Sequence, residues 1–208
     1  MNRIKLLVGN ELFSDGKKVL KGERLFYDPY MKVNFKKFSV LVLYAREFDL
    51  NNCKRLVETY SFPMINDMVF IVGNEREKFQ LKNEFSGDFL PWIRVGVNQQ
   101  LSNTFYSSLK TGLRSISRRT EYIILQFGTM ADIKHETVSQ LMRGALKSKK
   151  DIIIPIFEDK RGHPILFSHS LLPILFSLRK EKGLPYILRK YKDSIEEIPV
   201  QDKNILKK

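Results

Sequence analysis

Short apolar runs alternate with amphipathic segments along most of the chain. The runs are rich in β-branched and aromatic residues and are mostly continuously apolar, which is typical of strands buried on both faces. They are Phe38–Tyr44, Met68–Val72, Trp92–Val97, Tyr122–Phe127 and Asp151–Phe157. Between them the hydrophobic period becomes that of a helix, in the segments Leu50–Tyr60, Glu75–Phe85, Ser102–Ile116 and Lys134–Lys147.

This alternation predicts the α/β fold class. Strand–helix–strand units with short connections pair their strands in parallel through right-handed crossovers. We therefore predict a Rossmann-like, doubly wound and mostly parallel sheet over residues 38–208. In such sheets ligands bind outside the carboxyl ends of the strands. The candidate ligand contacts are then the loops at 44–47, 73–74, 98, 128–132 and 158–164.

The first 37 residues do not continue the alternation. Asp15-Gly16 lies between two short apolar pairs, Leu12-Phe13 and Val19-Leu20, and Asp-Gly is a strong signal of a two-residue hairpin turn. We predict a small N-terminal β-hairpin extension over residues 1–37, ahead of the α/β domain at 38–208. The alternative takes Arg3–Gly9 as the first strand of the sheet, with a phosphate-binding loop after it.

Composition and charge narrow the class of protein. The chain has 208 residues, 43% of them hydrophobic, and no apolar run approaches the roughly 18 residues of a membrane helix. Cys53 is the single cysteine, which excludes a disulfide within this sequence and a cysteine-based metal site. We expect a cytoplasmic protein without a membrane partner.

The net charge of +13 comes from 36 Lys and Arg against 23 Asp and Glu, and most of the excess lies after residue 100. Such a basic balance favours polyanionic partners, such as nucleotides, phosphorylated cofactors or nucleic acid. It serves equally well as a solvated surface. No nucleic-acid-binding module is recognisable, so nucleic acid is the weakest of these partners.

The most distinctive stretch is Arg161-Gly162-His163-Pro164, which follows the fifth apolar run and a polar turn. Pro164 restricts His163 to an extended conformation, and Gly162 permits an unusual backbone angle. Arginine offers a planar donor fork suited to phosphate, and histidine binds or transfers a proton near neutral pH. We interpret Arg161 and His163 as ligand contacts at the mouth of the sheet. The alternative is a hairpin corner in which His163 satisfies local backbone groups.

Four motifs, in order, resemble those of the MobA/MocA-like molybdenum-cofactor nucleotidyltransferases, which carry CMP or GMP onto molybdopterin. They are Asn98–Leu113, the strand and turn 123–131 with Gly128-Thr129-Met130, Glu136-Thr137 with Leu141, and Arg161–Phe167. The resemblance implies a nucleotide-diphospho-sugar transferase-like fold and a partner such as CTP, GTP or a molybdopterin-like phosphorylated ligand. It implies as substrate- or nucleotide-binding residues Asn98, Ser108, Gly128, Thr129, Arg161, Gly162 and His163.

The sequence departs from this family where metal and phosphate are held. Thr129 stands in place of an aspartate that helps to hold Mg²⁺, and a neutral hydroxyl cannot offset the charge of a hard cation. A second family carboxylate would follow Val200–Leu206, but the sequence stops at Lys208. Neither candidate first strand is followed by the family's glycine-rich phosphate loop. We therefore expect no metal site and assign no catalytic residue. Mg²⁺ would be a cofactor only if an acid such as Asp132 replaced the lost ligand.

Two hypotheses of function follow. In the first, the chain is a nucleotidyltransferase-like protein of molybdenum cofactor biosynthesis that transfers weakly or only binds a nucleotide or pterin. In the second, it is a non-enzymatic scaffold or chaperone-like protein that keeps the fold as an interaction surface. Its partner would then be another protein, in contact with the basic second half of the chain.

Overall fold

The computed structural model describes residues 37–44, 48–85, 92–99, 104–180 and 183–207, and four short strands nearer the N-terminus. The chain divides into two compact units, residues 1–35 and 36–208, and each is described by itself. Within the described residues, no helix is long and apolar enough to cross a bilayer.

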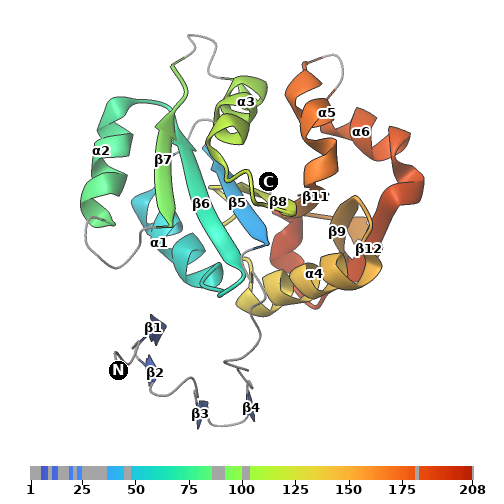
Figure 1. The fold of residues 1–208 in the computed structure, drawn as a ribbon, viewed down its shortest axis with the longest axis horizontal. Coiled ribbons are helices and arrows are strands. Elements are labelled where there is room, and N and C mark those ends of the chain that lie inside the picture. The colour runs from blue at the N-terminus through green and yellow to red at the C-terminus, as the bar shows by residue number, and fades with distance from the viewer. Residues whose placement is uncertain are drawn as a thin grey trace. The chain divides into compact units, whose positions relative to one another are not determined.

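The larger unit is built on one mixed, mostly parallel sheet. Its strands lie in the order β10-β9-β11-β8-β5-β6-β7, and β12 pairs with β9 (Figure 1). β7, β6, β5 and β8 run parallel to one another, β11 runs antiparallel to β8 and β9, and β12 is parallel to β9. The strands are β5 (Phe38–Leu43), β6 (Ile65–Val72), β7 (Ile93–Val97), β8 (Tyr122–Phe127), β9 (Ile152–Phe157), β10 (Lys160–Arg161), β11 (Ile165–Ser168) and β12 (Ile195–Pro199).

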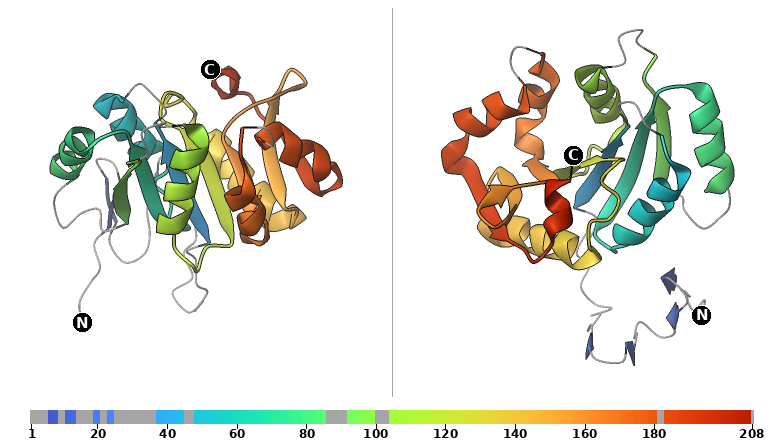
Figure 2. Two further views of the ribbon diagram at one scale, coloured as in Figure 1. Left: turned by 90° about the horizontal axis from the view of Figure 1, so that it is seen from above. Right: turned by 180° about the vertical axis from the view of Figure 1, so that it is seen from behind.

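Helices cover both faces of this sheet (Figure 2). They are α1 (Leu50–Thr59), α2 (Glu75–Glu84), α3 (Phe105–Ser115), α4 (His135–Ser148), α5 (Leu172–Ser177) and α6 (Leu184–Lys190), with 3₁₀ turns at His169–Leu171, Lys192–Ser194 and Lys203–Leu206. One buried cluster joins the sheet to α1, α2 and α4, through residues such as Leu56 and Leu141. The other joins it to α3, α5 and α6, through Leu109 and Leu175. The predicted doubly wound α/β architecture is confirmed.

Local side-chain chemistry fixes where the helices begin. Asp49 caps α1 by accepting hydrogen bonds from the backbone N–H groups of Asn51 and Asn52. Thr104 and Ser107 form a reciprocal capping box at the start of α3. Such caps satisfy N–H groups that have no partner within the helix. α3 therefore begins at Phe105, slightly later than the predicted start at residue 102.

The first strand of the large sheet is β5. Among the described strands, β1 (Leu6–Val8) pairs with β2 (Glu11–Phe13) in a two-stranded sheet and with no strand of the large sheet, which contradicts the alternative that placed Arg3–Gly9 in the main sheet.

The N-terminal unit carries strands, as predicted, but their pairing differs. β2 pairs with β1, and β3 (Val19–Leu20) pairs with β4 (Glu23–Arg24), so Leu12-Phe13 and Val19-Leu20 do not pair with each other. Each observed pair is separated in sequence by two residues that include a glycine, so the sequence carries hairpin signals besides Asp15-Gly16. Asp15 and Gly16 themselves lie outside the described residues.

Candidate functional site

The carboxyl ends of β5, β6, β7 and β8 meet at one edge of the sheet, because these strands are parallel. The strand order reverses between β5 and β8, since β6 and β7 extend on one side of β5 and β8 lies on the other. Doubly wound sheets bind their ligands at such a switch point. The candidate site is therefore the set of loops that follow these strands.

Asn98 and Ser108, two of the predicted binding residues, contact each other at this edge. Asn98 follows β7, is buried, and donates from Nδ2 to the hydroxyl oxygens of Ser107 at 2.6 Å and Ser108 at 3.0 Å. These bonds tie the end of β7 to the first turn of α3. The three side chains thus form a buried polar cluster that holds the end of β7 against the start of α3.

Tyr44 and Gly128 meet at the switch point itself. Tyr44 follows β5, Gly128 follows β8, and a Cβ atom on Gly128 would collide with the tyrosine ring. The Tyr44 hydroxyl lies 3.1 Å from Sγ of Cys53 and donates to the carbonyl oxygen of Asp49 at 3.4 Å. Burial raises the pKa of Tyr44, and it raises the pKa of the Cys53 thiol to about 12. Both groups are therefore neutral, and the ring fills space between β5 and β8.

His163 lies near the same edge, against Phe127, the last residue of β8. Its ring packs edge-on against Phe127, with centroids 4.7 Å apart, and its backbone N–H donates to the carbonyl oxygen of Ile205 at 2.9 Å. Burial lowers the pKa of His163 to about 4, so the ring is neutral near pH 7. Its Nδ1 atom is buried and has no hydrogen-bond partner. Gly162 is required here by close approach, since a Cβ would strike the Ile205 carbonyl oxygen.

Arg161 does not share this position with His163. It lies on β10, is exposed, and donates from Nε to the Glu197 carboxylate of β12 at 2.5 Å. The two side chains that the sequence placed together at the mouth of the sheet therefore have different surroundings, Arg161 at the surface beside Glu197 and His163 partly buried beside Phe127. Binding roles for Arg161, Gly162 and His163 stay predictions.

Thr129 and Asp132 lie in the loop between β8 and α4. Both are exposed, and the Asp132 carboxylate accepts from Arg55 Nη1 at 2.7 Å and from Lys207 Nζ at 2.6 Å. The hydrogen bond from Lys207 is the largest of the effects that lower the pKa of Asp132. This acid is thus fully charged near neutral pH and already neutralised by two cations.

Two other carboxylates near this loop are also engaged. Asp202 is buried and accepts from the backbone N–H of Lys134 at 2.9 Å, from the Thr137 hydroxyl at 2.9 Å and from the backbone N–H of Asn204 at 3.1 Å. Asp49 caps α1. Mg²⁺ needs carboxylate oxygens that are open to coordination. These three carboxylates do not fit that ion, and no group of three or more acids, histidines or cysteines in the described ranges is placed to hold a metal.

A family model adds sequence evidence to this geometry. The model of the MobA-like NTP transferase domain matches residues 55–195. The chain belongs to the MobA-like NTP transferase domain family. No curated protein sequence matches it.

Solved structures share the fold of this MobA-like domain. Rv0371c from Mycobacterium tuberculosis, in complex with manganese, superposes with a TM-score of 0.63 at 17% identity, over 79% of this chain and 88% of that one. The 4-diphosphocytidyl-2C-methyl-D-erythritol synthase of Anaerococcus prevotii gives 0.59 at 13% identity, over 84% and 91%. Molybdopterin-guanine dinucleotide biosynthesis protein A of Archaeoglobus fulgidus gives 0.50 at 17% identity, over 78% and 84%. At these identities the likeness shows a nucleotidyltransferase-like fold.

Sequence reasoning placed Tyr44 and Asp132 in candidate loops but missed what their side chains contact. The ring of Tyr44 at the switch point had one signal, an aromatic residue directly after the first strand. The cluster of Arg55, Asp132 and Lys207 had none, because Asp132 is 77 residues from Arg55 and 75 from Lys207 along the chain.

Proposed function

We propose that this MobA-like domain binds a phosphorylated ligand of the class of CTP, GTP or molybdopterin at the carboxyl edge of its sheet, without metal-assisted nucleotidyl transfer. The observation that carries the proposal is the pairing of Asp132 with Arg55 and Lys207. A metal-dependent transferase needs a carboxylate that is open to the metal. In this chain the Asp132 carboxylate is already neutralised by two cations.

Nucleotidyl transfer builds negative charge on the triphosphate and its acceptor, and enzymes offset that charge with metal ions or aligned cations. Without a metal, the rate of transfer should be greatly reduced. Arg55 and Lys207 are both half-exposed, and together with Asp132 they leave one net positive charge at the edge. One net positive charge supports binding of a phosphate group through charge-assisted hydrogen bonds. It offsets only part of the charge that develops during nucleotidyl transfer, so little acceleration of that step is expected.

The link to molybdenum cofactor maturation rests on two supports. The first is the order of the motifs around Asn98, Gly128 and Arg161, and the second is the fold likeness to the Archaeoglobus fulgidus protein. Another neighbour, CMP-2-keto-3-deoxy-manno-octonic acid synthetase, was solved with CTP bound. We propose a nucleotide or a pterin phosphate of this class as the ligand.

Calorimetric titration of the purified chain with CTP and GTP, in Mg²⁺ and then in EDTA, tests the proposal. We expect the same affinity in both conditions and no pyrophosphate release. Combining Arg55→Met with Lys207→Met should weaken binding by about tenfold, because two charge-assisted contacts are lost. Arg143→Met, at an exposed position on α4, is the matched control. Binding that requires Mg²⁺ together with pyrophosphate release would overturn the proposal.

A second candidate, a non-enzymatic scaffold, is favoured by the Tyr44 ring, which fills space at the switch point. A scaffold should bind no nucleotide even at millimolar concentration. It should instead co-elute with a purified molybdoenzyme or an active nucleotidyltransferase in gel filtration. Measurable nucleotide turnover by the chain alone would count against this second function.

A further inference from the structure

A cavity of ≈ 530 Å³ lies toward the amino edge of the sheet, where α2 and α3 end beside β7. Among the described strands β7 pairs only with β6, so one of its edges faces this cavity. The volume is within the range of small-molecule sites. Apolar side chains line it from three elements, among them Phe85 after α2, Val95 on β7 and Ile116 after α3.

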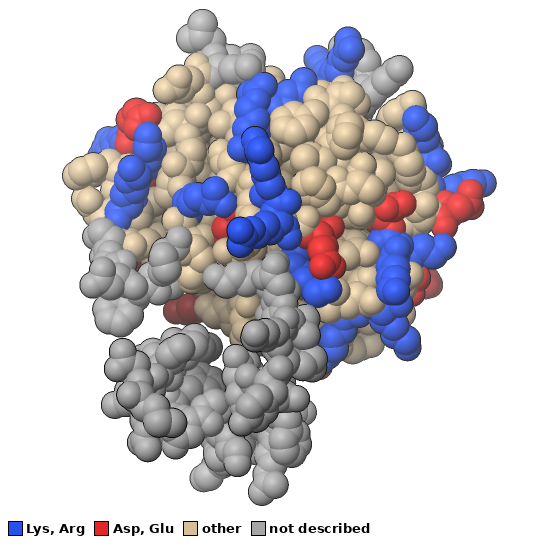
Figure 3. Space-filling view, in the orientation of Figure 1, with Lys and Arg blue, Asp and Glu red and all other residues tan. Residues whose placement is uncertain are grey.

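Three cations surround this apolar lining: Lys82 from the last turn of α2, Arg94 from β7 and Arg114 from the last turn of α3. Lys82 and Arg114 are exposed and form no ion pair or hydrogen bond within the described part of the chain. In Figure 3 a run of Lys and Arg side chains crosses the face that carries α3.

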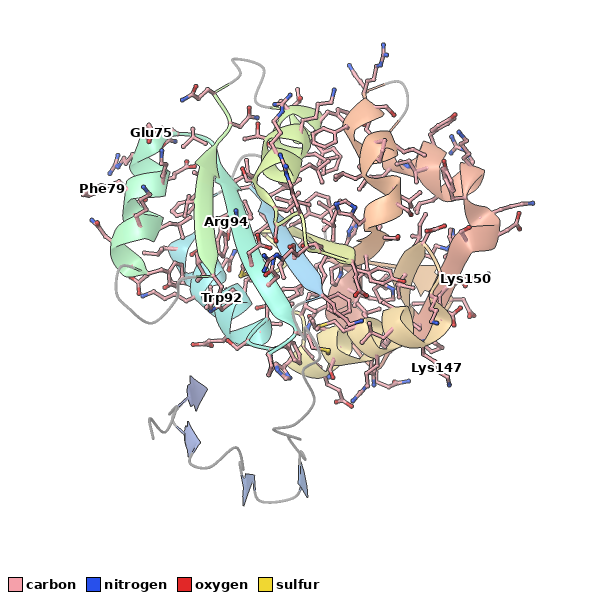
Figure 4. The ribbon with its side chains drawn as sticks, viewed as in Figure 1. Glu75, Phe79, Trp92, Arg94, Lys147 and Lys150 are labelled. Carbon is pink, nitrogen blue, oxygen red and sulfur yellow. The ribbon has the colours of Figure 1, made fainter. Side chains whose placement is uncertain are left out.

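Arg94 is held in place by an ion pair with Asp67. Its guanidinium pairs with the buried carboxylate of Asp67, which also accepts from the Ser39 hydroxyl and, at 2.9 Å, from the backbone N–H of Ser117. Figure 4 shows Arg94 on the sheet, beside Trp92 at the start of β7. An arginine fixed in this way loses little further freedom when it binds an anion.

The charges around the cavity leave a positive surplus. Asp67 cancels one of the three cations, and the carboxyl ends of α2 and α3 each contribute roughly half a negative charge. Roughly one positive charge remains. Complementing the helix dipoles accounts for Lys82 and Arg114, and the buried Asp67 accounts for Arg94, but neither reason accounts for the convergence of the three cations on one apolar cavity.

We propose that this cavity binds a small aromatic anion, a phosphate, sulfonate or carboxylate group carried on an apolar ring. The ring lies against Phe85, Val95 and Ile116, and the anionic group faces Lys82, Arg94 and Arg114. The site is separate from the carboxyl edge, where the loops after β5 and β8 meet, and it does not depend on the function proposed there.

Fluorescence titration of the full chain with 1-anilinonaphthalene-8-sulfonate tests the proposal, because this dye combines a sulfonate with apolar rings. We expect saturable binding of one dye per chain, weakened at least tenfold by Lys82→Met combined with Arg114→Met. Neither substitution removes an ion pair or a hydrogen bond within the described residues, so circular dichroism should be unchanged and the melting temperature should fall only slightly, through the lost interaction with the two helix dipoles. Arg143→Met, at an exposed position on α4, which contributes no residue to the cavity, should bind the dye like the natural chain.

Three outcomes would overturn the proposal. One is equal dye affinity in the double variant and the natural chain. Another is loss of dye binding in the Arg55→Met and Lys207→Met double variant, which would assign the dye to the carboxyl edge. The third is competition by inorganic phosphate at the same concentration as the dye, which would leave the apolar lining without a role.

Discussion

At the switch point, Gly128 packs directly against the ring of Tyr44, which leaves no room for a side chain at position 128. Gly128→Ala would place a methyl group against the tyrosine ring, and overpacking of this kind costs about 1–3 kcal/mol. Urea unfolding should show that loss in the natural background. In a Tyr44→Leu background the added methyl has room, so the penalty should shrink by at least about 0.5 kcal/mol. An equal penalty in both backgrounds would contradict the contact.

His163 should make stability depend on pH. Its pKa falls from 6.5 to about 4 on folding, so the unfolded chain binds the extra proton more readily between these values. The contribution to stability is therefore complete above pH 6.5 and is lost as the pH falls toward 4. The loss amounts to about 3 kcal/mol at most. Unfolding free energies across this range should fall less steeply in His163→Phe, and identical slopes would contradict the burial of the neutral ring.

Single residues also show where prediction from sequence ends. Asn98 and Gly128 were expected at one edge of the sheet because strand periodicity alone places them after β7 and β8. The ion pairs of Asp132 follow from packing of α1 and the C-terminal segment around one loop, which no local pattern encodes. Likewise, the ion pair of Arg161 involves Glu197, a residue of another strand that lies 36 positions away in the sequence.

At the scale of elements, Asp202 joins the start of α4 to the C-terminal 3₁₀ turn. Asp202→Ala would leave the Lys134 and Asn204 N–H groups and the Thr137 hydroxyl without their acceptor. We expect a loss of about 2–4 kcal/mol in urea unfolding, since each unsatisfied buried donor costs about 1–3 kcal/mol. Asp193→Ala, at an exposed position, is the control and should change stability by less than about 0.5 kcal/mol. Equal effects of the two substitutions would show that the cap is unimportant.

The same scale separates the elements that periodicity predicts from those it misses. The long segments, five strands and four helices, carried enough residues for their period to be recognised. β12 was missed because Glu196 and Glu197 interrupt its apolar pattern. The polar residues are tolerated because, among the described strands, β12 pairs with β9 alone. β11 was missed because it spans only Ile165–Ser168 and directly follows the turn at His163.

At the scale of the whole molecule, all described core residues lie between Phe38 and Ile205. We therefore expect a chain that begins at Lys36 to fold on its own, in keeping with the division into two units. Its melting temperature should stay within about 4 °C of that of the full chain, a shift that corresponds to about 1 kcal/mol or less. Loss of cooperative unfolding in the shorter chain would show that residues 1–35 complete the core.

Cys53 gives the molecule a built-in reporter. It is the single cysteine of the sequence, has no exposed surface, and lies in α1 beside the Tyr44 hydroxyl. A thiol-specific reagent can reach its sulfur only when α1 opens away from the sheet. The labelling rate in the unmodified protein therefore measures how often that region opens. Because α1 also carries Arg55, a ligand bound at the carboxyl edge should slow the labelling. The labelling rate of the natural thiol then reports what fraction of the protein has that ligand bound.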